Sequence, residues 1–196
     1  MEYDNKYWNN RYLDKNTPWN LNQATNPIEN YIKQLKRKDL RILIPGGGMG
    51  HEAALLFHLG FHNTYLLDFA EEPLMKFKSI HPYFSKNQIL CMDFFDLKLK
   101  FDLVIEQTFF CAIEPCLREK YTSTMSKILN PKGKLVGLLF NDFYNNSHPP
   151  FGATKSEYLN YFSAYFEVKY FDICYNSVES RKNKEFFFNL VKKSND

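Results

Sequence analysis

Apolar residues along the chain gather in short runs that alternate with stretches of helical periodicity. The first clear run, residues 41–45, stops in a cluster of glycines, and apolar residues then recur at helical spacing up to Gly60. The same order repeats until about residue 164, and two further runs follow with no helical pattern between them. The predicted strands are 41–45, 64–68, 88–91, 101–105, 134–140, 167–175 and 185–191, and the predicted helices are 28–36, 53–59, 71–80, 116–129 and 154–164.

This alternation predicts an α/β fold. Repeated strand–helix steps build a doubly wound, Rossmann-like sheet that is mostly parallel, because each helix returns the chain to the same edge. The two last runs form a hairpin, which predicts an antiparallel strand at the C-terminal edge. A length of 196 residues fits a single domain, 1–196, whose first 26 residues are polar, aromatic and turn-rich.

Composition narrows the function classes. The net charge is +3 and the Lys and Arg residues are scattered, whereas a nucleic-acid binder concentrates them on one face. The apolar runs fall short of the roughly 20 residues that span a membrane, and the N-terminus has no apolar signal-peptide core. Cys91, Cys111, Cys116 and Cys174 form no Cys-x-x-Cys pair, which favours free thiols in a reducing compartment. We therefore expect a cytoplasmic monomer that binds neither nucleic acid nor membrane.

The glycine cluster is the strongest chemical signal. Gly46, Gly48 and Gly50 follow a strand and precede a helix, and glycines there let the backbone turn tightly and approach a ligand. Asp68 ends the next strand, 18 residues after Gly50, where a carboxylate accepts hydrogen bonds from ribose hydroxyls. The dinucleotide pattern Gly-x-Gly-x-x-Gly of an NAD-dependent dehydrogenase is absent, and so is a Walker loop. The spacing is that of S-adenosylmethionine (SAM)-dependent methyltransferases; a tight turn and a strand-end cap at Asp68 are the structural alternatives.

An acidic and aromatic loop follows the third strand and borders the crevice at the carboxyl ends of the strands. Asp93 is placed to accept a hydrogen bond from an adenine amino group, while Phe94 or Phe95 covers the ring. Two core phenylalanines beside a surface aspartate explain the same residues equally well.

Polar residues also follow the fourth strand directly. Glu106, Gln107 and Thr108 precede Phe109 and Phe110, and by the same rule they face the ligand cleft. Thr108 and the two phenylalanines would then border the methyl group that is transferred.

These residues resemble the thiopurine methyltransferase-like family, especially its plant and bacterial thiol and halide methyltransferases. Four segments, ordered and spaced as in the family, carry the resemblance from residue 8 to about residue 155, and Phe-Cys-Ala-Ile-Glu-Pro is the most distinctive string. The segments are Trp8-x3-Tyr12-x4-Thr17-Pro18-Trp19 with Gln23-Ala24-Thr25, the loop 45–50, residues 101–103 through 109–115, and Pro149-Pro150-Phe151, with Arg181-Lys182 as a weaker echo.

The resemblance implies SAM as the cofactor and S-adenosylhomocysteine as its product. It implies that Trp8, Tyr12 and Trp19 form a lid over the cofactor, and an aromatic face attracts a cation such as the sulfonium by about 0.5–2 kcal/mol. Simple packing of the two tryptophans is the alternative. The implied cofactor residues are Trp8, Tyr12, Trp19, Gly46, Gly48, Gly50, Asp68, Phe69, Asp93, Phe94, Glu106 and Gln107, and the implied acceptor residues are Trp8, Trp19, Phe109, Phe140 and Arg181.

The chain also departs from the family. Many relatives have Cys at the position of Gly47, an aromatic or Trp at that of Tyr12, and Tyr at that of Gln107. Gly-Gly precedes the Pro-Pro pair in the family, where this chain has Ser147 and His148. The change at Gly47 is compatible with cofactor binding, and the other changes leave the methyl acceptor open.

Methyl transfer from SAM requires mainly that the methyl donor and the acceptor are aligned. A thiol with a pKa near 8.5 is about a few per cent ionised at pH 7, so no dedicated base is expected. His51, Glu52 and His58 do not match His-Glu-x-x-His, and no metal is expected. Arg181 draws an anionic acceptor toward the cleft or forms a surface ion pair. The predicted function is methyl transfer to a small soft nucleophile, a thiol, hydrogen sulfide, a halide, a thiopurine or a selenium or tellurium species; a SAM-binding sensor without chemistry is the alternative.

Overall fold

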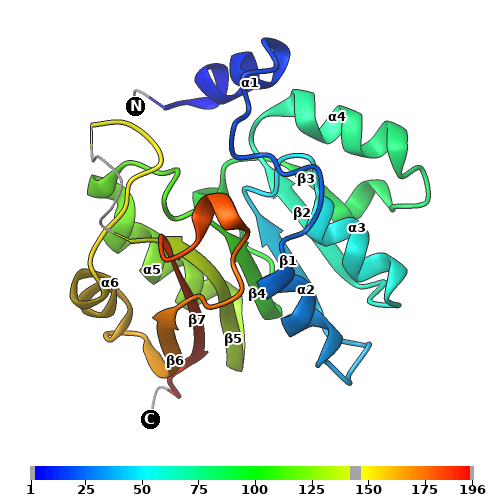
Figure 1. Cartoon of the computed structure of the whole chain (residues 1–196). Helices are drawn as coiled ribbons and strands as arrows, with labels where there is room; N and C mark the ends of the chain where they lie inside the picture. The colour runs from blue at the N-terminus through cyan, green and yellow to red at the C-terminus, as the bar shows by residue number, and fades with distance from the viewer. Residues whose placement is uncertain (1–2, 142–146, 195–196) are drawn as a thin grey trace. The chain divides into compact units, whose positions relative to one another are not determined.

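A computed structural model describes residues 3–141 and 147–194 of the chain (Figure 1). The chain divides into two compact units, residues 1–97 and residues 98–196, which we describe separately. Across the described ranges, no helix is both long enough and apolar enough to cross a membrane.

The first unit contains three parallel strands with β2 in the centre, paired with β1 on one side and with β3 on the other. All four residues of β1 are buried, as expected for a parallel strand covered on both faces. Pairing aligns the carboxyl ends of the strands, so that Pro45 lies opposite Leu67 and Asp68 opposite Cys91. The elements are α1 (Asn5–Leu13), α2 (Asn26–Lys33), β1 (Ile42–Pro45), α3 (His51–His58), β2 (Thr64–Asp68), α4 (Glu71–Ile80), β3 (Ile89–Cys91) and the short 3₁₀ helices η1 (Lys86–Gln88) and η2 (Phe94–Asp96).

Helix α1 was not predicted, because residues 5–13 carry no apolar stripe. Local hydrogen bonds begin it: the Asp4 carboxylate accepts the backbone N–H of Tyr7 at 2.8 Å. Two asparagines then hold it to the start of α4. The Asn5 amide donates to the Phe69 carbonyl at 2.6 Å, and the Asn9 side-chain oxygen accepts the Glu72 N–H at 2.9 Å. The aromatic N-terminal segment is therefore a helix docked beside the end of β2.

The second unit is a four-stranded sheet with the order β4-β5-β7-β6. Strand β5 is parallel to β4, and β7 runs antiparallel to both β5 and β6, which confirms the antiparallel component predicted for the C-terminal end. The elements are β4 (Phe101–Gln107), η3 (Pro115–Leu117), α5 (Arg118–Ile128), β5 (Leu129–Phe140), α6 (Lys155–Phe162), β6 (Phe166–Ile173), η4 (Glu179–Arg181) and β7 (Glu185–Lys192).

Strand β5 begins earlier than the sequence predicts. The sequence Asn130-Pro131-Lys132-Gly133 predicts a turn before the strand. These residues lie inside β5, where the register with β4 shifts between Phe101 and Leu103 and Lys132 has a φ of 60°. Leu129 already pairs with Phe101, so the turn is an irregularity within a paired strand.

Close packing of the sheet depends on a glycine in the middle of β5. Gly137 lies opposite Glu106 of β4 and Phe188 of β7. A Cβ atom at Gly137 would come within 1.9 Å of the Glu106 carbonyl oxygen, a backbone atom that no side-chain rotation moves away.

We expect Gly137→Ala to lower the free energy of unfolding by about 3 kcal/mol, the upper part of the usual range for an overpacked core. Urea unfolding followed by circular dichroism measures the change. Gly60→Ala is the control, since its added methyl meets no atom within 4 Å and only the φ of 86° is unfavourable, at about 1 kcal/mol. A loss at Gly137 no larger than that at Gly60 would show that the sheet adjusts freely.

Candidate functional site

The glycine loop of the first unit has a backbone that few other residues adopt. Gly46, Gly48 and Gly50 have φ values of 57°, 51° and 70°, in the left-handed region, and Gly50 is the N-cap of α3. A Cβ atom at Gly48 would lie 2.2 Å from the Tyr12 hydroxyl oxygen. The loop therefore needs glycine at Gly48 both for its dihedral angles and for the approach of α1.

Asp68 joins this loop to the end of β2. Its Oδ2 atom accepts the Gly48 N–H at 2.9 Å and its Oδ1 atom accepts the Ala70 N–H at 2.9 Å. Burial raises the pKa of the carboxyl to about 6. The hydrogen bonds from the backbone N–H groups of Ala70 and Gly48 lower the pKa and so offset part of this effect. Each carboxylate oxygen has room for a further hydrogen bond. The strand-end role considered for Asp68 is therefore present, and it leaves the carboxylate able to bind a ligand hydroxyl.

The three predicted lid aromatics form one cluster. The ring of Trp19 meets those of Trp8 and Tyr12 edge-to-face, with centroids 5.3 and 5.9 Å apart. Tyr12 lies over the glycine loop, and burial together with the nearby Asp68 charge raises the pKa of its hydroxyl above the usual range, so that it stays neutral. The Arg11 guanidinium lies 4.8 Å from the centroid of Trp19. A protein cation thus already uses the attraction of this ring, which the sequence did not reveal.

The loop after β3 is tied to Asp68 through the backbone, since the Met92 N–H donates to the Asp68 carbonyl at 3.1 Å. Asp93 begins η2, its Oδ1 atom accepting the Phe95 N–H at 2.8 Å. Phe94 is buried and Phe95 is half-buried, with ring centroids 5.5 Å apart. Phe94 is thus packed in the interior, Phe95 is only partly covered, and the second Asp93 oxygen has capacity for another donor. Of the predicted residues, Gly46, Gly48, Gly50, Asp68, Phe69, Asp93 and Phe94 all lie at or directly after the carboxyl ends of β1, β2 and β3.

In the second unit, Glu106 shapes the turn that follows β4. The side chain is fully buried, and its Oε1 atom accepts the Phe110 N–H at 2.7 Å. Burial raises the pKa of this carboxyl to about 8, against the backbone N–H groups of Phe110 and Phe109. Thr108 takes a φ of 60° and its N–H donates to the Leu138 carbonyl at 3.0 Å, which fixes the start of the turn on β5. Glu106 thus holds the segment that carries the predicted acceptor residue Phe109.

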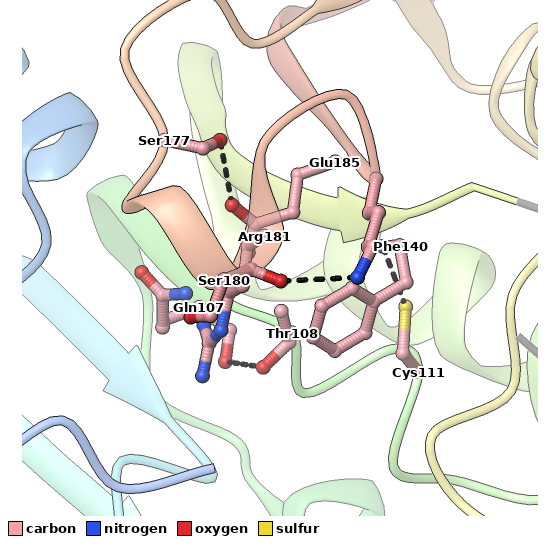
Figure 2. A network of polar contacts seen from close by, with 9 residues as sticks. Gln107, Thr108, Cys111, Phe140, Ser177, Ser180, Arg181 and Glu185 are labelled. Atoms are coloured by element: carbon pink, nitrogen blue, oxygen red, sulfur yellow. Dashed lines mark hydrogen bonds and ion pairs between the residues drawn. The ribbon is translucent and has the colours of Figure 1, made fainter. Parts of the chain in front are cut away.

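A buried thiol connects this turn to the end of β5. The Phe140 N–H donates to the Cys111 sulfur at 3.3 Å (Figure 2). The Tyr158 hydroxyl donates to the Phe140 carbonyl at 2.5 Å. Burial raises the pKa of Cys111 to about 12. Cys111 is therefore a neutral structural group and a poor nucleophile.

The Pro-Pro-Phe segment is held by Arg118 at the start of α5. The guanidinium is buried and donates to the carbonyls of Phe151 and Gly152 at 3.0 and 3.3 Å. It also lies 5.1 Å from the ring centroid of Phe110. The segment Pro149-Pro150-Phe151, which carries part of the family resemblance, therefore packs against the turn after β4.

Arg181 forms an ion pair, and the pair is buried. Its Nη1 atom lies 3.3 Å from Oε1 of Glu185, and the side chains are 8% and 1% exposed. Of the two alternatives for Arg181, an ion pair is present, but it is buried and not at the surface. The Ser177 hydroxyl donates to Glu185 Oε2 at 2.7 Å (Figure 2). Sequence reasoning missed Glu185 and Ser177, although the spacing of Arg181 and Glu185 was a signal.

Arg181 also lies 5.4 Å from the ring centroid of Phe140, and Figure 2 draws Gln107 in the same group. The predicted residues Glu106, Gln107, Phe109, Phe140 and Arg181 thus gather around the carboxyl ends of β4 and β5. Within the described parts of the chain, no group of three or more His, Cys, Asp or Glu side chains is arranged to hold a metal ion.

The model of the family described as thiopurine S-methyltransferase (TPMT) matches residues 3–193. The chain belongs to the thiopurine S-methyltransferase family. It is 32% identical over 159 residues to "Probable thiol methyltransferase 2" of Arabidopsis thaliana, covering 77% of this chain and 69% of the relative. It is 28% identical over 161 residues to "Thiocyanate methyltransferase 1" of Brassica oleracea, with the same coverage of 77% and 69%.

A solved structure with a similar fold is the Burkholderia thailandensis 1,6-didemethyltoxoflavin-N1-methyltransferase with bound S-adenosylhomocysteine. It aligns with a TM-score of 0.81 at 15% identity and covers 97% of this chain and 87% of that chain. The predicted α/β fold of a class I methyltransferase is therefore confirmed. This member of the thiopurine S-methyltransferase family is an enzyme that uses SAM to methylate a small nucleophile. Its glycine turn and the remaining acceptor capacity of Asp68 fit the cofactor.

We expect Glu106 to make the fold less stable as pH rises. Its pKa is raised from an ordinary 4.5 to about 8 in the folded chain, so the protonated carboxyl favours the folded state. That stability is complete below pH 4.5 and is lost as the pH rises to about 8. Glu106→Gln, which does not ionise, should flatten this part of the curve of unfolding free energy against pH.

Urea unfolding at pH 5.5, 7 and 8.5 measures the slope for both proteins. Glu119→Gln, on the exposed side of α5, is the matched control and should follow the wild type. Equal slopes in Glu106→Gln and the wild type would mean that Glu106 titrates as it does in the unfolded chain.

Proposed function

We propose that this thiopurine S-methyltransferase family member transfers the methyl group of SAM to the thiol of a small molecule. The observation that carries the choice of a thiol is the state of the two acids, Glu106 and Glu185, at the ends of β4 and β7. Glu106 is buried and bonded to Phe110, and both oxygens of Glu185 are engaged. Neither is available as a strong base, which disfavours an alcohol as the acceptor, whereas a thiol is partly ionised at neutral pH and needs no base.

On the cofactor side, we propose that Gly46, Gly48 and Gly50 border the methionine part of SAM. The free acceptor positions of Asp68, beside Phe69, would take the ribose hydroxyls. When bound, SAM supplies a methyl group on a positively charged sulfur.

The remaining predicted residues would complete the two sides of the reaction. Asp93 and Phe94 would border the adenine, and the aromatic cluster of α1 would cover the donor. Gln107 and the turn held by Glu106 would border the methyl group. In the second unit, Phe109, Phe140 and Arg181 would contact the acceptor. In the first unit, Trp8 and Trp19 are the proposed acceptor residues.

The chain's contribution to the rate would be alignment and exclusion of water. Holding two reactants in an attack geometry lowers a barrier by roughly 7–11 kcal/mol without any proton transfer by the protein. The hydrogen bonds of Glu106, Cys111 and Tyr158 keep the turn after β4 in one conformation, as such alignment requires.

For the cellular setting, we propose a cytoplasmic monomer in which residues 1–196 work as one methyltransferase domain and bind neither nucleic acid nor membrane. Free cysteines support a reducing compartment: Cys91 and Cys116 are exposed without forming disulfides, and Cys111 and Cys174 are buried thiols.

If Asp68 binds the ribose, SAM affinity should depend on its charge. The pKa of about 6 means that affinity falls as pH drops from 7.5 to 5.5, because ribose hydroxyls donate more strongly to the ionised carboxylate. Asp68→Asn should weaken binding roughly tenfold or more at pH 7.5, since hydrogen bonds to a charged group contribute about 1.5–3 kcal/mol each.

Calorimetric titration with SAM and S-adenosylhomocysteine measures both effects. Asp96→Asn, an exposed aspartate in η2, is the control and should bind as the wild type does. An affinity that is the same at pH 5.5 and 7.5 would remove Asp68 from the ribose site.

The acceptor class is tested by incubating the enzyme with methyl-labelled SAM and 2-mercaptoethanol, hydrogen sulfide or a simple aromatic thiol. We expect labelled thioethers, with rates that rise with pH as the thiol ionises, and no product from the matched alcohol ethylene glycol. SAM binding without methylated product across the thiols would support a sensor and overturn the proposed function.

A further inference from the structure

A histidine directly after the glycine loop is bonded to the segment that carries Trp19. His51 is the first residue of α3 and follows Gly50, the N-cap of that helix. Its Nε2 atom lies 2.9 Å from the side-chain oxygen of Asn20, 31 residues earlier in the chain. Both side chains are half-buried, and both residues belong to the first unit. The bond therefore joins the end of the glycine loop to the segment that follows α1.

The direction of this hydrogen bond follows from the other contacts of Asn20. Its Oδ1 atom also accepts the backbone N–H of Asn22 at 2.9 Å, which identifies this atom as the amide oxygen, an acceptor. His51 therefore donates through its Nε2–H group. Burial, and then the nearby His81, lower the pKa of His51 below its ordinary value, so the ring is neutral at pH 7. The donor thus adds no positive charge beside the loop proposed to border the cationic cofactor.

The segment that His51 binds is a compact turn. The Asn20 N–H donates to the Thr17 carbonyl at 3.0 Å, and Asn22 takes a φ of 57°, which asparagine adopts more readily than most residues. Trp19 lies inside this turn, directly before the residue that accepts the His51 bond. A displacement of Asn20 would therefore move the indole of Trp19 as well.

Side chains of α1 hold the same indole within the aromatic cluster. The ring of Trp19 meets those of Trp8 and Tyr12 edge-to-face, and the Arg11 guanidinium lies 4.8 Å from its centroid. These contacts place the indole relative to α1. The His51 bond ties the turn to the start of α3, and so it places the cluster relative to the glycine loop.

We propose that His51 is a positioning residue that acts through Asn20 to hold Trp19 over the bound cofactor and so slows the release of the cofactor. This inference rests on the proposed function, in which the aromatic cluster covers the donor, and deepens it. Because the bond lies outside the reacting atoms, its loss should weaken the binding of SAM without slowing the transfer of the methyl group.

The first measurement needs no cofactor. Both tryptophans of the chain, Trp8 and Trp19, lie in the aromatic cluster, so tryptophan fluorescence reports on this cluster without a label. His51→Ala should move the emission to longer wavelength and increase its quenching by acrylamide, because water reaches a loosened indole.

The second measurement is the affinity for the cofactor. In His51→Ala, calorimetry should show a roughly three- to tenfold loss of affinity for SAM and S-adenosylhomocysteine, the range that one neutral hydrogen bond contributes. With 2-mercaptoethanol as the acceptor, the KM for SAM should rise by a similar factor, and kcat should not fall.

Further variants separate the hydrogen bond from a general loss of structure. His51→Gln places a side-chain N–H near the position of the histidine Nε2 and should restore both the emission and the affinity. His58→Ala is the matched control, since it removes an exposed histidine from the other end of the same helix and should behave as the wild type.

Asn20→Ala tests the acceptor of the bond. It should cause at least the loss seen in His51→Ala. The double variant should lose no more affinity than Asn20→Ala alone, because a bond that is already broken cannot be lost again.

A folded His51→Ala protein with the emission and the SAM affinity of the wild type overturns the proposal. So does a double variant whose loss of binding free energy is the sum of the two single losses, since the two residues would then act independently. If His51→Ala does not fold, Asn20→Ala decides the question, because wild-type emission and affinity in that variant also overturn the proposal. A wild type that binds SAM and methylates no thiol contradicts only the proposed function, since emission and affinity test His51 without an acceptor.

Discussion

The first unit depends on one buried carboxylate. Asp68 accepts N–H groups from Gly48, 20 residues earlier, and from Ala70, two residues later. These bonds compensate part of the loss of hydration that raises its pKa, and they set the distance between the glycine loop and the end of β2. Because Tyr12 lies directly over Gly48, the same contact also sets where α1 docks. A ligand bound by Asp68 would therefore meet a loop and a helix, α1, that are already in place.

The second unit uses buried acids in a different way. Glu106 is bonded to the turn that it stabilises, and Glu185 is bonded to Arg181 and Ser177. Neither carboxylate is presented as a general base. This arrangement suits methyl transfer from a sulfonium, in which the donor is already activated and the protein mainly aligns the reactants.

Local patterns in the sequence predict some elements of this fold and not others. The strand 64–68 was predicted with the bounds that the structure has, since an apolar run closed by an acid leaves little choice of register. Helix α1 has no apolar stripe that predicts it. The two asparagines that dock it, Asn5 and Asn9, are polar, and their partners at Phe69 and Glu72 lie more than sixty residues away. The expected turn at 130–133 became part of β5 because Leu129 pairs with Phe101 before the irregularity.

The sequence by itself determined the order of the strands and of the helices after α1, the glycine loop and the acid that ends the second strand. These features depend on local periodicity and on residue types at short spacing, so they can be read without coordinates. Only the tertiary structure decided which acids are buried, which are paired and which keep capacity for a ligand. The sequence left Arg181 either beside the cleft or in a surface ion pair, and the fold buries it together with Glu185. The physical reason is that charge and pKa depend on desolvation and on neighbours that the chain brings together only when it folds.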